Sequence, residues 1–96
     1  SPPPPPTKHE IIATLMMALE AHYDQVAQSR EYDNRYTCAL RAGYPSIFQA
    51  EGMAFGIWMD NCNAYAYQVM QDCLDGKRDI PTAEELIAEL PVINWP

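Results

Sequence analysis

The amino-acid sequence predicts a small all-α domain: an antiparallel helical bundle of two long helices and two short ones, with an extended apolar C-terminal tail. Two long stretches carry apolar residues at steps of three and four, which is the spacing of one face of a helix. The second stretch runs from Ser46 to Gly76 without a proline. Hydrophobic residues make up 48% of the chain, which argues against disorder.

The chain begins with a polyproline run, Ser1–Pro6, which favours a stiff extended helix and predicts a linker ahead of one domain, residues 7–96. Such a run is also a ligand for aromatic grooves, but here it lacks flanking basic residues. Thr7 and Glu10 form a capping-box pattern, so the first long helix is expected to start there. Its apolar stripe continues to about Ala27 and consists of Ile11, Ile12, Leu15, Met16, Leu19, Tyr23 and Val26.

A bend and a short helix are expected between the two long helices. Asp33 is the predicted cap of the short helix, and Gly43 is the residue that ends it. Tyr32, Tyr36 and Tyr44 are amphipathic side chains of the kind found at binding surfaces. Half-buried tyrosines that close a small core are the alternative interpretation.

The second long helix is predicted from Ser46 to Gly76, with Gly76 as its C-terminal stop. Gly52 and Gly56 lie inside it, and each costs about 1 kcal/mol relative to alanine. Close approach of another backbone explains such glycines, and so does a kink; the antiparallel first helix is the expected neighbour. The predicted core stripe consists of Ile47, Ala50, Ala54, Ile57 or Trp58, Cys62, Tyr65, Val69 and Cys73.

A turn follows at 77–80, and Thr82 and Glu85 form a second capping box. The short amphipathic helix that they start is expected to end before Pro91. Beyond it lies an extended apolar tail, which either packs back across the helices or docks onto a partner. Its apolar side chains are Val92, Ile93 and Trp95.

Charge and composition argue against several classes of function. The net charge is −7, and from Ser46 onward two basic residues stand against eight acidic ones. A surface of this kind repels phosphates, so direct binding of nucleic acid is not expected. No apolar run approaches the roughly 18 residues of a membrane span, so no membrane association is expected either.

The sequence shows no pattern typical of a catalytic site, a cofactor site or a metal site. It contains no nucleophile elbow, no phosphate-binding loop and no H-E-x-x-H motif. Its three cysteines form no C-x-x-C pair, and its two histidines, His9 and His22, are not at metal-ligand spacing. We therefore expect no enzyme activity, no cofactor and no metal.

The second half of the chain carries six short segments that form one pattern: Ala50–Gly52, Ile57–Asp60, Asp75–Arg78, Pro81–Leu86, Leu90–Pro91 and Asn94–Pro96. With this pattern the chain resembles the C-terminal region of small bacteriophage tail proteins of the tail-fibre assembly or tail-assembly type, over most of residues 7–96. These proteins commonly have a proline-rich lead, a first helix, a Gly-Tyr-Asp bend and an ending of Leu-Pro, three residues and Trp-Pro. In this chain the bend reads Glu31-Tyr32-Asp33, without the glycine.

This resemblance implies a non-enzymatic protein-binding module that acts as a chaperone or adaptor for another phage tail or tail-fibre protein. It would work in the host cytoplasm during assembly or in the virion tail, with a second copy of the chain as a further partner. Two other functions stay open: a structural baseplate or fibre domain kept in the virion, and an acidic inhibitor that mimics nucleic acid. The candidate partner-binding residues are Tyr32, Tyr36, Tyr44 and Phe48 at the corner, and Val92, Ile93 and Trp95 in the tail.

Overall fold

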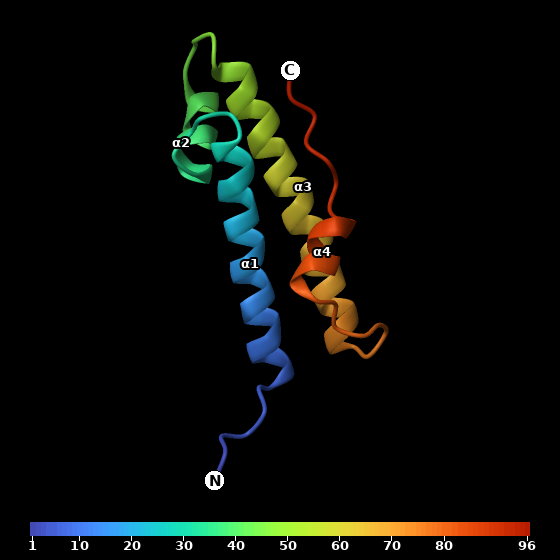
Figure 1. Cartoon of the computed structure of the whole chain (residues 1–96). Coiled ribbons are helices and arrows are strands. Elements are labelled where there is room, and N and C mark those ends of the chain that lie inside the picture. Colours follow the sequence, from blue (N-terminus) through green and yellow to red (C-terminus); the bar gives the residue numbers. More distant parts are fainter.

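The computed structural model describes all 96 residues, and every regular element in it is a helix (Figure 1). This confirms the predicted all-α class. The molecule is elongated, with principal extents of 55 × 30 × 19 Å. The elements are α1 (Lys8–Gln28), α2 (Arg35–Leu40), the short 3-10 helix η1 (Arg41–Gly43), α3 (Gln49–Leu74) and α4 (Ala83–Glu89).

The two long helices, α1 and α3, are antiparallel (Figure 1). Lys8 Nζ at the start of α1 donates to the carbonyl oxygen of Cys73 at the end of α3 over 3.0 Å. A cation near a helix C-terminus is favourable because the last carbonyl groups carry partial negative charge. Closer to the other end of the pair, the rings of Tyr23 and Trp58 meet edge to face with centroids 5.3 Å apart. The core consists of Leu15, Leu19, Tyr23, Ala27, Cys38, Phe55, Trp58, Cys62, Ala66, Val69, Met70, Cys73, Leu86 and Leu90.

Both predicted capping boxes are present, at the starts of α1 and α4. The Thr7 hydroxyl accepts from the Glu10 amide over 3.2 Å, and the Thr82 hydroxyl accepts from the Glu85 amide over 3.1 Å. In each case the glutamate carboxylate accepts from the backbone amide of the threonine. These caps are local in sequence, which is why the pattern locates them.

The predicted cap of α2 is wrong by one residue. Asn34, rather than Asp33, caps the helix: its Oδ1 accepts from the amides of Tyr36 over 2.9 Å and Thr37 over 3.1 Å. The Thr37 hydroxyl in turn accepts from the Asn34 amide over 3.1 Å. Asn and Asp cap helices about equally well, so residue type does not separate two neighbours. The threonine three positions after Asn34 completes the box and fixes the start of the helix.

The start of α3 also differs from the prediction, because Ser46 organises a turn instead of opening the helix. Its hydroxyl oxygen accepts from the Phe48 amide over 3.1 Å, and its carbonyl accepts from the Gln49 amide over 3.2 Å. The helix therefore begins at Gln49. Ile47, expected in the core, lies on this turn with 88% of its surface exposed.

The predicted core stripe of α3 is confirmed at Trp58, Cys62, Val69 and Cys73, and the buried face differs from it elsewhere. Phe55, fully buried, and Trp58, 5% exposed, fill the interior beside α2 and the C-terminal segment, while Ile57 is 59% exposed. α3 carries apolar residues on several faces, so the spacing fits more than one stripe. The larger aromatic side chains gain more from burial, so Phe55 and Trp58 face the core and Ile57 does not. The buried face consists of Gly52, Phe55, Trp58, Cys62, Ala66, Val69, Met70 and Cys73.

A close backbone approach explains Gly52 but not Gly56. A Cβ atom on Gly52 would lie 2.5 Å from the Ala42 amide nitrogen and 2.8 Å from the Arg41 carbonyl carbon. The close neighbour is therefore η1, and the expectation that α1 makes this contact is wrong. A Cβ atom on Gly56 would meet nothing within 4 Å.

The turn that follows α1 contains a strained residue. Glu31 has φ of 68°, and it lies in a Schellman motif in which the Tyr32 amide donates to Ala27 over 3.2 Å and the Glu31 amide to Gln28 over 2.9 Å. This left-handed conformation costs a residue with a Cβ about 1–2 kcal/mol, and glycine adopts it freely.

Glu31→Gly is expected to raise the free energy of unfolding by about 1 kcal/mol, because it removes the left-handed strain while costing some chain entropy. Urea unfolding followed by circular dichroism measures the change. Gly76→Ala is the matched control, since Gly76 has φ of 76° in a second Schellman motif at the end of α3. Gly76→Ala is expected to lower the free energy of unfolding by a similar amount. If Glu31→Gly is no more stable than the parent, the backbone at Glu31 is not strained.

An ion pair fixes α4 to the end of α3. Arg78 donates through both terminal nitrogens to Glu89, each over 2.9 Å, and the Tyr65 hydroxyl donates to the same carboxylate over 2.6 Å. The hydrogen bonds from Arg78, and then that from Tyr65, lower the pKa of Glu89 from 4.5 to about 2. The folded state therefore binds a proton at Glu89 less readily than the unfolded chain does.

The stabilisation by Glu89 is expected to be fully present above about pH 5 and to be lost as the pH falls from 4.5 towards 2. In this range the unfolded chain binds the proton first, so acidification favours unfolding. Urea midpoints of the parent and Glu89→Gln, measured at pH 7, 4 and 3, should converge as the pH falls. Glu84→Gln in the same helix is the matched control, and a difference that does not depend on pH contradicts the role of the pair.

Candidate partner-binding surface

Three of the four predicted corner aromatics gather around one arginine. The Arg41 guanidinium lies 6.0 Å from the ring centroid of Tyr32 and 5.8 Å from that of Phe48. Its Nη1 donates to the Tyr44 hydroxyl over 2.7 Å. Its Nε is buried without a hydrogen-bond partner in the chain. The contact of η1 with Gly52 brings Arg41 to this place, so the corner is built around the close approach of the two backbones.

Tyr32 belongs to the fold more than to a surface. It is half-buried, and its hydroxyl donates to Glu51 over 3.0 Å. Glu51 also accepts from Arg30 over 3.1 Å, so this carboxylate links the end of α1 to the start of α3. Burial, with the Glu51 hydrogen bond, raises the pKa of Tyr32. The alternative interpretation, core closure, therefore describes Tyr32.

Other side chains at the same end of the molecule are exposed. We call the surface formed by Leu40, Tyr44, Ile47, Phe48 and Met53 the apolar end. Its first four residues lie along the connection between α2 and α3. It includes two predicted residues, Tyr44 and Phe48, and three that were not predicted as partner-binding. The exposed fractions are 65% for Leu40, 40% for Tyr44, 88% for Ile47, 45% for Phe48 and 51% for Met53.

Tyr36 lies apart from the other corner aromatics. The Arg35 guanidinium lies 4.4 Å from its ring centroid and donates to its hydroxyl over 2.9 Å. Arg35 is itself held by Asp24, which accepts from its backbone amide over 2.9 Å and from its guanidinium over 2.8 Å. Tyr36 is 68% exposed at the rim of a hollow of about 260 Å³, the tyrosine groove. Its lining residues are Met16, Glu20, Tyr23, Arg35, Tyr36, Ala39, Met59, Asn63 and Tyr67.

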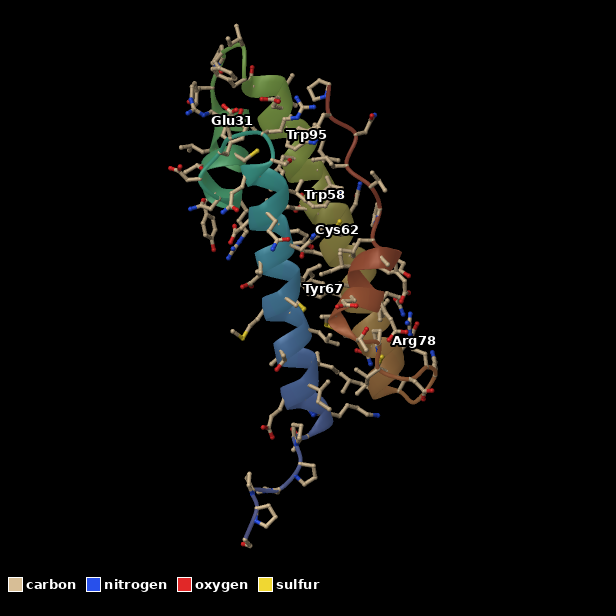
Figure 2. The ribbon with its side chains drawn as sticks, in the orientation of Figure 1. Glu31, Trp58, Cys62, Tyr67, Arg78 and Trp95 are labelled. Atoms are coloured by element: carbon tan, nitrogen blue, oxygen red, sulfur yellow. The ribbon has the colours of Figure 1, made fainter.

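The C-terminal tail packs back across α3. Trp58 Nε1 donates to the Pro91 carbonyl over 2.7 Å, and the Trp95 ring stacks on Phe55 with centroids 6.1 Å apart. The guanidinium of Arg30 lies 4.7 Å from the Trp95 ring centroid. Figure 2 shows Trp95 and Trp58 at successive levels along α3. The tail thus follows the first of its two predicted alternatives.

Among the predicted tail residues, only Val92 is free for a partner. It is 91% exposed, whereas Ile93 and Trp95 are half-buried and pack against the core. The structure therefore separates the seven predicted residues into two groups. Tyr32, Ile93 and Trp95 contribute to the fold, and Tyr36, Tyr44, Phe48 and Val92 remain accessible.

Sequence reasoning missed Ile47, the most exposed residue of the apolar end, because it placed Ile47 at the start of a helix stripe. A signal was available. Ile47 follows Pro45 and Ser46, and a serine hydroxyl favours a turn as readily as a helix start. An isoleucine on a turn that no element covers is exposed by necessity. Tyr67 carried no comparable signal, since the tyrosine groove forms only when three helices meet.

The three cysteines are buried, whereas His22 is half-buried and His9 is exposed. Burial raises the pKa of Cys62 to about 11, and burial together with Glu51 raises that of Cys38 to about 11, so both thiols stay protonated near neutral pH. Burial lowers the pKa of His22, which packs edge to face on Trp58 at 5.9 Å. No three His, Cys, Asp or Glu side chains are grouped so that they could hold a metal ion.

The acidic groups of the surface are partly neutralised within the chain. Arg30 pairs with Glu51, Arg35 with Asp24, and Arg78 with Glu89. These pairs reduce the continuous negative surface that a mimic of nucleic acid would need. None of the helices is both long enough and apolar enough to cross a membrane. Comparisons with protein-family models, with curated proteins and with solved structures find no match.

Proposed function

We propose that this chain is a non-enzymatic protein-binding module that acts in the assembly of a phage tail or tail fibre, as a chaperone or adaptor for another tail protein. The phage context comes from the resemblance, which spans most of residues 7–96. The mode of action comes from one observation, the exposure of Ile47 at 88% among other exposed apolar side chains of the apolar end.

An exposed isoleucine on a turn is a strong anchor for a partner. Burying such a side chain contributes about 1.5–3 kcal/mol, which corresponds to roughly a tenfold to hundredfold change in affinity. The backbone beneath it is held by the Ser46 hydrogen bonds and by the contact of η1 with Gly52, so little order has to be gained on binding. Aromatic side chains around an aliphatic anchor are typical of the centre of a protein interface.

Ile47→Asp is expected to weaken binding of the tail partner by tenfold or more, because a charged side chain cannot enter an apolar pocket without losing its hydration. The change lies on an exposed turn, so the thermal unfolding midpoint should stay within a few degrees of the parent. Affinity is measured by co-precipitation of the partner from lysate of phage-infected cells. Met17→Asp is the matched control, since Met17 is 70% exposed on the outer face of α1.

The alternative function is that of a structural domain that is kept in the mature virion. An assembly chaperone leaves the particle, whereas a structural domain stays at fixed copy number. Mass spectrometry of purified mature particles separates the two. We expect the chain to be absent from particles and present with its partner in lysate; a fixed copy number in particles replaces the chaperone role by that of a structural adaptor.

A further inference from the structure

The tyrosine groove is a second candidate surface, separate from the apolar end. It lies where the middle of α1, the outer side of α2 and the middle of α3 meet. Tyr23, 2% exposed, forms its floor, while Tyr36 and Tyr67, 68% and 59% exposed, stand at its rim. Half-buried Met16 and Met59 line it as well. Figure 2 shows Tyr67 on the stretch of α3 that faces the middle of α1.

The polar atoms that remain free in this groove include three donors. The Tyr23 hydroxyl donates to Asn63 Oδ1 over 2.8 Å, which occupies the amide oxygen and leaves the amide nitrogen of Asn63 available. The Tyr36 hydroxyl accepts from Arg35, so its own proton is free. The Tyr67 hydroxyl makes no hydrogen bond within the chain. The groove therefore combines aromatic and thioether walls with hydrogen-bond donors.

A polyproline helix is the ligand that fits this chemistry. Proline has a backbone carbonyl and no N–H, so a run of prolines offers only acceptors together with apolar rings. Proline-rich segments bind aromatic-lined grooves in this way, with little loss of entropy because the extended helix is preformed. The groove spans Met59 to Tyr67 on α3, roughly 12 Å at 1.5 Å per residue, which fits about four residues of a polyproline helix at 3.1 Å each.

This chain carries such a ligand at its own start. Residues 1–6 are exposed and make no hydrogen bond to the rest of the chain. They extend away from the bundle beyond Thr7 (Figure 1). The groove begins at Met16, roughly 12 Å along α1 from its first residue, Lys8. This is the direction opposite to the one in which residues 1–6 extend. A stiff proline run cannot reverse on itself to reach it, so the segment can enter only the groove of another molecule.

We propose that the polyproline segment Pro2–Pro6 of a second copy of this chain binds in the tyrosine groove. The prolines lie against Tyr36 and Tyr67, and their carbonyl groups accept from Asn63 and from the two tyrosine hydroxyls. The contact joins different surfaces of the two molecules, so it produces either an exchanged pair or a longer array. It leaves the apolar end free for the tail partner.

The test is a titration of the isotope-labelled chain with an acetylated peptide of residues 1–8, followed by NMR. We expect saturable shifts of the Asn63 side-chain amide and of the Met16 and Met59 methyl groups. Tyr67→Ala should weaken binding of the peptide at least tenfold. Because Tyr67 is exposed, this change should leave the chain folded. Ile47→Asp, at the apolar end, should leave binding of the peptide unchanged. The test of the tyrosine groove is therefore independent of the test of the proposed function. A peptide with alternate prolines replaced by glycine should not bind.

Sedimentation velocity of the full chain tests the occupant. We expect the sedimentation coefficient of the parent to rise with concentration. Tyr67→Ala, and a variant with Pro2–Pro6 replaced by alanine, should both keep the sedimentation coefficient of a monomer. No shifts at millimolar peptide, or shifts unaffected by Tyr67→Ala, overturn the groove as a proline site. A chain that binds the peptide but stays monomeric at millimolar concentration overturns the second copy as its ligand.

Discussion

Gly52→Ala is expected to lower the free energy of unfolding by about 2–3 kcal/mol, the cost of overpacking a site that cannot relax. The added Cβ would lie 2.5 Å from the Ala42 amide nitrogen and 2.8 Å from the Arg41 carbonyl carbon. Both contacts are with backbone atoms, so no flexible side chain can move aside. η1 would have to separate from α3, and the arrangement of Arg41 with Tyr44 and Phe48 would change with it.

Gly56→Ala is the matched control for this prediction. It lies one turn later in the same helix, and a Cβ there meets nothing within 4 Å. Alanine is favoured over glycine inside a helix by about 1 kcal/mol, so this variant should be more stable than the parent by about that amount. Urea unfolding of both variants measures the difference. Equal effects of the two substitutions contradict a close approach at Gly52.

Trp58→Ala is expected to have the largest effect, a loss of about 3–5 kcal/mol, which is the usual cost of truncating a buried aromatic. Trp58 is 5% exposed and packs on Tyr23 and Phe55, with centroids 5.3 and 5.6 Å away. It is also the side chain that binds the tail, through the hydrogen bond to Pro91. For a domain of this size such a loss is most of the stability, so much of the population should be unfolded at room temperature.

Trp58→Phe separates packing from the hydrogen bond. Phenylalanine keeps most of the ring contacts but cannot donate to the Pro91 carbonyl, so a loss of about 1–2 kcal/mol is expected. Hydrogen exchange of the tail amides and the fluorescence of Trp95 report whether residues 91–96 detach before the helices unfold. A tail that stays fully protected in Trp58→Phe contradicts the role of this bond.

The sequence predicts those parts of the fold that short segments determine by themselves. The two threonine capping boxes and the stop at Gly76 each depend on residues within one helical turn, and the structure confirms them. The core face of α3 could be predicted only at Trp58, Cys62, Val69 and Cys73, because α3 carries apolar residues on several faces and only packing chooses among them. The same holds for Gly52, whose neighbour is determined by the path of the chain through η1.

The candidate surface was predictable only in part, for a related reason. A tyrosine pattern does not show whether a hydroxyl will find a buried partner, as Tyr32 finds Glu51, or stay at the surface, as Tyr44 does. The sequence predicts Trp95 as a partner-binding residue, but in the structure its ring stacks on Phe55 and lies against the guanidinium of Arg30. In each case the outcome depends on contacts between residues more than fifteen positions apart.

The proposed function is tested most directly by co-precipitation from lysate of phage-infected cells, with the parent chain, Ile47→Asp and Met17→Asp as parallel baits. The proposal predicts that the parent and Met17→Asp retain a tail or tail-fibre protein, and that Ile47→Asp loses it at least tenfold while remaining folded. A parent chain that retains no tail protein, or an Ile47→Asp variant that retains it as well as the parent does, contradicts the proposed binding at the apolar end.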